Sequence, residues 1–428
     1  MILQKVKKDG HLTDRELADF AAEAFSNEDI DGKRVLFLIP DGTRSMPMPE
    51  MFRALCKTLR GRVAKLDYLI ALGTHPPMSD NAINRFLGIT AQQRRGEFAD
   101  VDIFNHEWRN PDALTCVGTL TEDEIAEISG GLMRRKVDVV VNRRILEYDL
   151  ICIVGPVFPH EIVGISGGNK YFFPGVAGAG IVDLTHWLGA LITTSVVIGV
   201  KDTPVRQVVD RAATLIKRQK RCFCLSVMGK DCRGIFYGAP EEAWSAAAHL
   251  VATTHIVYKE HPYKNVLALA PPMYDELWVA GKCMYKVEPV VADGGELIIY
   301  APHISEVSLT HGHLIRRTGY HTRDYFLAQA EKYRDVPEVV QAHCTHVRGI
   351  GRYEDGVEEC RIRVTLATQI PEEECHAINL GYRDPASIDP DEWRNREDEG
   401  LLLVPDAGEV LYRLTQGNPK PPPLRVRV

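Results

Sequence analysis

Short apolar runs alternate with amphipathic segments through the first half of the chain, and this alternation constrains the fold more than any other feature. Residues 34–39 and 150–154 have the length and the branched apolar side chains of buried strands, whereas residues 47–59 have the apolar spacing of a helix. Helices between strands are typical of parallel sheets, because a chain must cross over before it pairs in the same direction. Further strands are expected at 66–72, 137–141 and 195–200, and further helices at 205–218 and after the capping box of Thr13 and Glu16.

A second series of expected strands follows residue 262, at 266–270, 296–300 and 361–366. A chain of 428 residues is longer than one hydrophobic core usually serves. We therefore expect an α/β fold of two domains with mostly parallel sheets, residues 1–266 and 267–428, and the active site in the cleft between them. The prolines after Asn418 lack amide donors, so the tail is expected to be a polyproline-like extension.

The composition excludes several classes of partner. The 51 Lys and Arg residues against 58 Asp and Glu give a net charge of −7, and no basic block offers a surface to nucleic acid. No apolar run reaches the ~18–20 uncharged residues that span a bilayer, so no membrane is expected as a partner. The first ten residues carry charges where a signal peptide needs apolar side chains, so we expect a cytoplasmic protein. The ten cysteines are scattered, which favours small buried side chains over a metal site.

Polar residues follow three of the expected strands directly. They are Asp41-Gly42-Thr43-Arg44, Gly73-Thr74-His75 and His160. In open α/β sheets, ligands bind beyond the carboxyl ends of the strands. Each motif by itself fits a surface turn, but the three together on one edge predict a functional site.

A glycine-rich loop, from Gly164 to Lys170, follows soon after His160. Its bare amides could cradle a phosphate, but Asn169 stands where a P-loop has glycine, so the loop is not a P-loop. Aromatic residues follow Lys170, and an apolar surround weakens the preference of an amine for its charged form. Lys170 is therefore a candidate nucleophile or covalent anchor. His186, sixteen residues further on, is by itself more typical of a core histidine.

Other residues give weaker signals. Trp278 and Lys282 share one helical face if their segment is a helix. A divalent metal site is an alternative for the histidines His303, His311 and His313, but no carboxylate stands at ligand spacing. The pair His343 and His346 carries equally little weight.

Together these motifs resemble the nickel-dependent lactate racemase family, over nearly the whole chain to about residue 370. The loop Gly-Gly-x-Lys-x-x-x-Pro-Gly of that family matches residues 167–175. Its lysine matches Lys170 and binds a nickel-pincer nucleotide, pyridinium-3,5-dithiocarboxylic acid mononucleotide nickel. The catalytic histidine ten residues before the lysine matches His160, and the nickel-ligating histidine sixteen residues after it matches His186. The resemblance further implies a second catalytic histidine at His75, cofactor contacts at Asp41, Thr43, Gly167 and Gly168, and substrate contacts at Arg44, Lys282 and Trp278.

The sequence departs from the family pattern in two places. In the second-domain element the usual Tyr and Gln are Trp278 and Val279, so a polar substrate contact is missing and the substrate need not be lactate. Pro76 stands where the family often has arginine, which changes the rim around the histidine pair.

The resemblance implies an isomerase, a racemase or epimerase of a 2-hydroxy acid. It would work by reversible hydride transfer to the nucleotide bound through Lys170, with a 2-keto acid as intermediate. His75 and His160 would alternate as base and acid, Arg44 would hold the carboxylate, Lys282 would add charge for the developing oxyanion, and His186 would be the single protein ligand to Ni(II). The implied partners are the small-molecule substrate and the enzymes that mature the cofactor. Two other classes stay open: a zinc-dependent hydrolase using His75, His160 and His186, and a non-catalytic carrier of the nickel nucleotide.

Overall fold

A seven-stranded sheet organises the first part of the chain. The computed structural model describes residues 2–229 and 231–424. The order across the sheet is β1 (Leu3–Val6), β11 (Asp231–Gly238), β10 (Gln219–Met228), β7 (Leu150–Pro156), β2 (Arg34–Ile39), β3 (Lys65–Ile70) and β4 (Ile103–Asn105). In this order, the five strands from β10 to β4 run parallel to one another. Strand β11 pairs antiparallel with both β10 and β1, and β1 forms the edge of the sheet.

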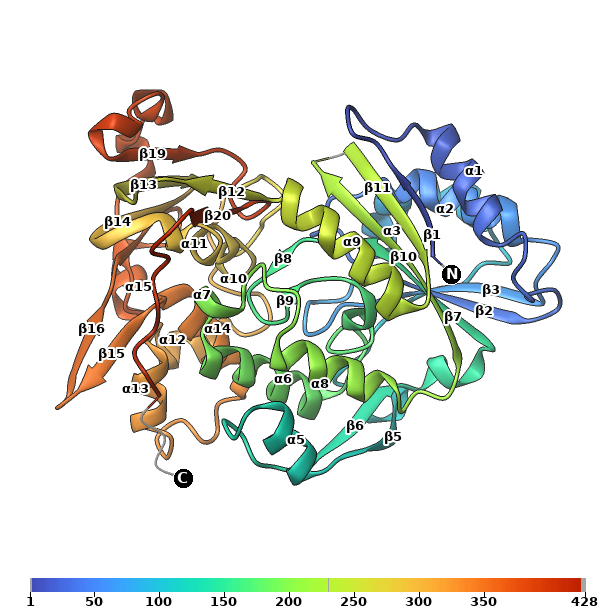
Figure 1. Cartoon of the computed structure of the whole chain (residues 1–428), viewed down its shortest axis with the longest axis horizontal. Helices are drawn as coiled ribbons and strands as arrows, with labels where there is room; N and C mark the ends of the chain where they lie inside the picture. The colour runs from blue at the N-terminus through green and yellow to red at the C-terminus, as the bar shows by residue number, and fades with distance from the viewer. Residues whose placement is uncertain (1, 230, 425–428) are drawn as a thin grey trace.

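Helices cover both faces of this sheet (Figure 1). Alternate side chains of β2 therefore enter different cores: Leu36 and Leu38 belong to one apolar cluster and Phe37 to the other. The cluster around Phe37 includes residues of α1 (Asp14–Ala24), α2 (Met48–Leu59) and α3 (Asp80–Leu87), and the other includes residues of α6 (Ala179–Ile192), α8 (Pro204–Ala213) and α9 (Pro240–Thr254). The expected capping box is confirmed, since the Glu16 amide donates to Thr13 Oγ1 and the Thr13 amide donates to Glu16 Oε2.

Two expectations for this half need correction. The strand expected at 137–141 exists as β6 (Val137–Asn142), but it pairs antiparallel with β5 (Leu114–Leu120) outside the main sheet. The strand expected at 195–200 is wrong, because α7 (Thr194–Val197) occupies this segment and the Ile198 amide closes its turn on the Thr194 carbonyl. Val197 and Ile198 are buried, whereas Val196 is exposed, so the apolar run reflects burial of part of a helical turn and not strand pairing.

A second, five-stranded sheet is parallel throughout. Its order is β18 (Gly381–Tyr382), β17 (Arg363–Thr368), β14 (Val291–Ala301), β13 (Tyr263–Leu269) and β19 (Leu401–Val404). All three strands expected in this half are therefore confirmed. The helices of this half are α10 (Leu277–Ala280), α11 (Lys282–Tyr285), α12 (Gly312–Thr318), α13 (Arg323–Ala328), α14 (Glu338–Arg348) and α15 (Glu372–Ala377).

Smaller elements complete the fold. Strand β12 (Ile256–Lys259) pairs parallel with β20 (Leu411–Leu414). The last residues described, 415–424, form no helix or strand, as expected for the proline-rich tail. The elements not yet located are α4 (Ala91–Arg95), α5 (Glu122–Ile128), β8 (Pro159–His160), β9 (Gly164–Ile165), β12 (Ile256–Lys259), β15 (Gly351–Glu354), β16 (Val357–Cys360) and β20 (Leu411–Leu414), with short 3-10 turns at Pro111–Ala113, Arg143–Glu147, Gly168–Tyr171, Glu288–Val290, Pro385–Ser387, Pro390–Trp393 and Glu397–Glu399.

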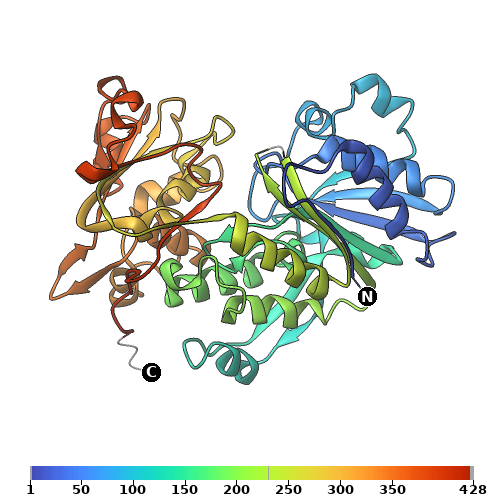
Figure 2. The same ribbon diagram turned by 45° about the horizontal axis from the view of Figure 1, so that its top comes forward.

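The two sheets are joined by packing between α6 and α14 (Figure 2). The Val339 amide at the start of α14 donates to Asp183 of α6, and Arg135 forms a two-pronged ion pair with Glu338 at 2.8 and 2.6 Å. One apolar cluster also continues from the first sheet through α6 into the second. The division into residues 1–266 and 267–428 stays a prediction, although the second sheet begins at Tyr263.

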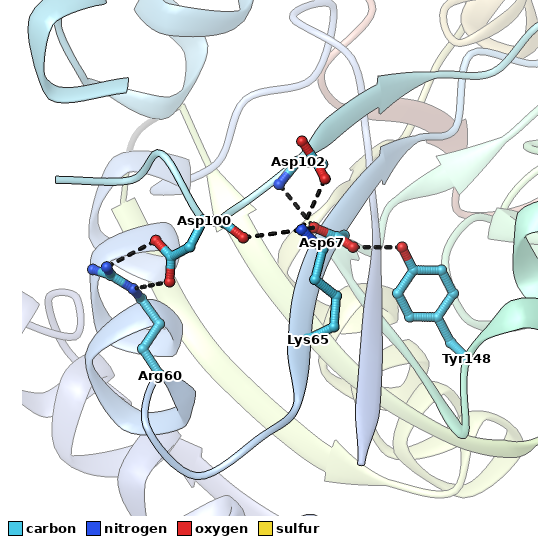
Figure 3. Close-up of polar contacts among 6 residues, drawn as sticks. All are labelled: Arg60, Lys65, Asp67, Asp100, Asp102 and Tyr148. Carbon is cyan, nitrogen blue, oxygen red and sulfur yellow. Dashed lines mark hydrogen bonds and ion pairs between the residues drawn. The ribbon is translucent and has the colours of Figure 1, made fainter. Parts of the chain in front are cut away.

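A buried carboxylate network lies towards the amino ends of the parallel strands (Figure 3). Asp67 on β3, 1 % exposed, accepts hydrogen bonds from the Tyr148 hydroxyl at 2.5 Å and the Asp102 amide at 2.8 Å. Lys65 lies 3.2 Å from the same carboxylate. These contacts satisfy the Asp67 oxygens, so the network fastens the loop before β4 to the sheet.

Eight of the ten cysteines are buried, as expected from their scatter. Within the described residues, no helix combines the length and the apolar character needed to cross a membrane.

Candidate active site

A cavity of about 130 Å³ lies beyond the carboxyl ends of β2, β3 and β7. Segments of the second half, α10, α11 and α14, close its other side. The residues expected to form a site that line this cavity are Asp41, Arg44, His75, His160, Gly167, Lys170, His186, Trp278 and Lys282. Thr43 and Gly168 are not among the lining residues.

Asp41 and His75 form a pair that joins the ends of β2 and β3. His75 Nδ1 lies 2.5 Å from Asp41 Oδ2, and the Thr43 amide and hydroxyl donate to Asp41 Oδ1 at 3.0 and 2.6 Å. Although burial opposes ionisation, the adjacent His75 and Arg44 hold the pKa of Asp41 below its ordinary range. Because an ionised carboxylate only accepts, His75 Nδ1 carries the hydrogen of this bond, so the neutral form of the ring has its lone pair on Nε2. In that form the pair presents a base to the cavity.

His160 has the opposite arrangement of donors and acceptors. The Ile162 amide donates to His160 Nδ1 at 3.2 Å, so a neutral ring carries its hydrogen on Nε2. Burial, followed by the charges of Lys170 and Arg44, lowers the pKa of His160 well below its ordinary value. Glu161 Oε2 also lies 3.2 Å from Nδ1 and would accept from the ring once it is protonated. The two histidines therefore differ in resting tautomer.

Lys170 lies in a short 3-10 turn, Gly168–Tyr171, that is fixed by hydrogen bonds to side chains of α8 and α9. Arg206 of α8 donates to the carbonyls of Gly167 and Ile165. Asn169 Nδ2 donates to Asp210 at 2.9 Å and to Glu241 at 2.7 Å, which fixes the residue next to Lys170. Burial lowers the pKa of the Lys170 amine to about 8, so an unprotonated, nucleophilic form is accessible near neutral pH.

Glycines are required in this turn because neighbouring side chains approach closely. Gly168 has φ +58°, and a Cβ there would lie 2.9 Å from Cβ of Trp244. Gly155 on β7 faces Tyr171 so closely that a Cβ would lie 1.7 Å from the tyrosine oxygen. Close packing therefore requires glycine at both positions.

His186 lies on α6 with one ring nitrogen already bonded. Its Nδ1 lies 2.7 Å from the Val182 carbonyl, so Nδ1 carries the hydrogen and donates. Among the residues that the structure describes, nothing bonds to Nε2. Burial lowers the pKa of His186 to about 4, which keeps the ring neutral. A neutral imidazole fixed through Nδ1 is the form that ligates a metal through Nε2.

Arg44 and Lys282 supply positive charge at one end of the cavity. Arg44 Nη1 donates to Thr43 Oγ1 at 2.7 Å, which links it through Thr43 to the Asp41–His75 pair. The Lys282 amine lies 4.6 Å from the ring centre of Tyr274. Burial and then the charge of Arg44 lower the pKa of Lys282 well below its ordinary value, so an anion at this end would relieve the repulsion. The expected helix here is divided into α10 and α11, but both Trp278 and Lys282 still face the cavity.

Several lining or supporting residues were not predicted in these roles. Glu161 had a weak signal as the neighbour of a candidate histidine, whereas Arg206, Asp210 and Glu241 had none because they meet the loop only through folding. His343 and His346 also line the cavity, whereas His303, His311 and His313 do not. In the described ranges, no group of three or more His, Cys, Asp or Glu side chains is placed to hold a metal ion.

Comparison with known proteins adds independent information. The family model described as the lactate racemase N-terminal domain matches residues 4–197. A curated lactate racemase from Thermoanaerobacterium thermosaccharolyticum is 25 % identical over 282 residues, which are 63 % of this chain and 60 % of that protein. The match thus spans about three fifths of this relative.

Two solved structures are similar over nearly their whole length. A crystal structure of a protein from Thermotoga maritima is 32 % identical, covers 96 % of this chain and 100 % of its own, and has a TM-score of 0.87. The lactate racemase apoprotein from Thermoanaerobacterium thermosaccharolyticum has a TM-score of 0.70 at 17 % identity, with 94 % of each chain covered. The second likeness establishes a shared fold.

Proposed function

Because the chain belongs to the lactate racemase family, we propose that it is an isomerase that racemises or epimerises a 2-hydroxy acid. The observation that supports this most is that nine residues predicted from the sequence, the first and last of them Asp41 and Lys282, line a single cavity. The finer proposal is that it uses a nickel-pincer nucleotide bound through Lys170, with enzymes that build this nucleotide as partners in the cytoplasm.

The side chains present fit such a cofactor. Within the described chain, no hydrogen bond or ion pair engages the Lys170 amine, and its lowered pKa suits a covalent bond. His186 would ligate the nickel through Nε2. When bound, such a nucleotide supplies a reversible hydride acceptor, so that a 2-keto acid links the two configurations of the substrate carbon.

The remaining work falls to the protein. Arg44 and Lys282 would hold the substrate carboxylate and fix which carbon faces the nucleotide. His75 Nε2 would take the hydroxyl proton of one enantiomer, with Asp41 stabilising the ring as it becomes charged. His160 would serve the other enantiomer in the tautomer whose hydrogen lies on Nδ1, where Glu161 accepts it, so that Nε2 is free to take the proton. The cavity is proposed to lie between two domains, which would keep water from the reacting carbon.

Two measurements test this proposal. Intact mass and peptide mapping of protein produced together with the cofactor enzymes should find the adduct on Lys170, with nickel present. Racemisation in D₂O should give product without deuterium on the substrate carbon, because a hydride returns the original hydrogen. Deuterium in the product would refute hydride transfer, and an adduct without any racemisation would favour the carrier.

A further inference from the structure

The hydroxyl groups of the buried tyrosines point to a further binding group in the cavity. Most buried tyrosines in the described chain place the hydroxyl against a hydrogen-bond partner; these are Tyr68, Tyr148, Tyr237, Tyr263, Tyr274, Tyr320 and Tyr333. The buried tyrosines without such a partner among the described residues are Tyr171 and Tyr285, and both line the cavity. Buried polar groups are normally paired, so an unpaired hydroxyl in a cavity wall is available to a ligand.

The hydroxyl of Tyr285 is open to the cavity. The residue is 4 % exposed, yet its oxygen is not among the polar atoms of the described chain that are both fully buried and unpaired. The accessible surface of this oxygen therefore faces the cavity that the residue lines. Tyr171 belongs to the opposite wall, since it directly follows Lys170 and its oxygen packs against Gly155 near the end of β7.

Helix α11 places Tyr285 beside Lys282. Tyr285 follows Lys282 by three positions on this helix, so the two side chains share one face, and both line the cavity. Burial is the main cause that moves the pKa of Lys282 well below and that of Tyr285 well above its ordinary value, and the charge of Arg44 acts on both groups. The Tyr285 hydroxyl thus stays protonated, at the end of the cavity where Arg44 and Lys282 would hold the substrate carboxylate.

We propose that the Tyr285 hydroxyl donates a hydrogen bond to the substrate carboxylate and completes the binding site of Arg44 and Lys282. This inference rests on the proposed racemase function. A carboxylate offers about four lone-pair sites, and the two parallel bonds of Arg44 use one site on each oxygen. The sites that remain can accept from Lys282 and Tyr285. A neutral hydroxyl adds this donor without placing a further positive charge beside two cations.

Tyr285→Phe tests the contact, because it removes the hydroxyl and keeps the ring. Loaded native and variant enzymes are compared on whichever of lactate, 2-hydroxybutanoate, glycerate and malate the native enzyme racemises best. We expect KM to rise by about ten- to a hundredfold, as for the loss of a hydrogen bond to a charged group, with kcat within about threefold, because the carboxylate keeps its charge throughout the reaction. A fall in kcat with an unchanged KM would place the hydroxyl on the reacting C2 oxygen and overturn the inference.

Tyr148→Phe is the matched control. It removes another buried tyrosine hydroxyl, which bonds to Asp67, and Tyr148 is not among the residues that line the cavity. Its KM should equal that of the native enzyme. A rise in KM as large as that of Tyr285→Phe would show that the loss of any buried tyrosine hydroxyl weakens binding, and would overturn the inference.

Propanoate tests the same contact without turnover, because it has the carboxylate but no hydroxyl to be oxidised. Its dissociation constant, measured by ligand-observed NMR, should rise in Tyr285→Phe by a factor similar to that in KM and stay unchanged in Tyr148→Phe. Equal binding to native and Tyr285→Phe protein, or no binding to native protein, would overturn the inference and leave the racemase proposal standing. Absence of turnover for every acid in native enzyme that carries the Lys170 adduct would instead reject the racemase proposal, and propanoate would still decide the role of Tyr285.

Discussion

The pairing of Asp41 with His75 can be tested by replacing Asp41 with asparagine. In the native pair the carboxylate accepts from His75 Nδ1 at 2.5 Å, which leaves Nε2 free to act as a base. An asparagine that turns its NH₂ group towards the ring would donate to Nδ1 and move the ring hydrogen to Nε2. His75 would then present a donor where the substrate hydroxyl needs an acceptor.

The size of the effect follows from what the base contributes. A positioned general base accelerates proton transfer by roughly 10²–10⁴-fold, which is about 3–5 kcal/mol of barrier at 1.36 kcal/mol for each tenfold change. In the first half of the reaction, the rate of 2-keto acid formation should fall more for the enantiomer served by His75 than for the other. The other enantiomer is served by His160, whose contacts the substitution of Asp41 does not change. Over a full cycle kcat/KM falls by the same factor in both directions, because a substitution in the enzyme cannot change the equilibrium constant of the reaction.

A single-turnover experiment separates these cases. Loaded Asp41→Asn enzyme is mixed with an excess of one enantiomer, quenched at short times, and assayed for 2-keto acid. We expect formation from the enantiomer served by His75 to slow by about 10²–10⁴-fold, and formation from the other to slow by less than tenfold. Equal rates from both enantiomers, or turnover within tenfold of the native enzyme, would refute the assigned role of the pair.

Asp67→Asn is the matched control, since Asp67 is a buried aspartate of β3 (Figure 3) and is not among the residues that line the cavity. Its exchange disturbs the bonds from Tyr148 and Asp102 and should lower the free energy of unfolding by about 1–3 kcal/mol. Turnover by the folded protein should not change. Denaturant unfolding and kinetics of both variants therefore distinguish a loss of catalysis from a loss of stability.

Three further predictions concern the residues around the anchor. Arg44→Lys should raise KM for the acid by at least about tenfold with the Lys170 adduct intact, because an ammonium cannot make the two parallel bonds of a guanidinium; an unchanged KM would remove Arg44 from carboxylate binding. In protein without cofactor, the rate at which Lys170 reacts with an amine-directed reagent should rise with pH with a midpoint near pH 8, because burial disfavours the charged form of the amine. A midpoint near the ordinary lysine pKa of about 10.4 would contradict this. The φ of +58° at Gly168 and the 2.9 Å between a Cβ there and Cβ of Trp244 both disfavour a side chain. Gly168→Ala should therefore lower the free energy of unfolding by about 1–3 kcal/mol, as measured by calorimetry. It should also reduce the fraction of protein that carries the adduct, as measured by mass analysis.

The sequence predicted the sheets better than the connections between them. Strand β2 was predicted with its correct bounds because its residues are apolar on both faces and polar residues end the run. Residues 195–200 have the same branched apolar character but form α7 and the turn after it, where Val197 and Ile198 are buried without strand pairing. Composition cannot separate these two cases over so few residues.

The candidate site divides in a similar way. The spacing of His160, Lys170 and His186 pointed to one site because the resemblance attached a role to each position. The bond between Asp41 and His75 was not predicted, because it depends on β2 and β3 being neighbours in the sheet. The α14 histidines were given little weight because His346 lines the cavity only through the packing of α14 on α6, two helices that are far apart in the sequence.

The close approach of Gly155 and Tyr171 restricts how this site can evolve. Gly155 needs no unusual backbone angle, so glycine is required there only because the tyrosine ring occupies the space of a side chain. A larger residue at position 155 is tolerated only after residue 171 has been replaced by a smaller one. If residue 171 becomes smaller while residue 155 is still glycine, a cavity is left beneath the turn that carries Lys170. The two positions should therefore covary among homologous chains, and substitutions that reshape the pocket next to Lys170 should accumulate in pairs.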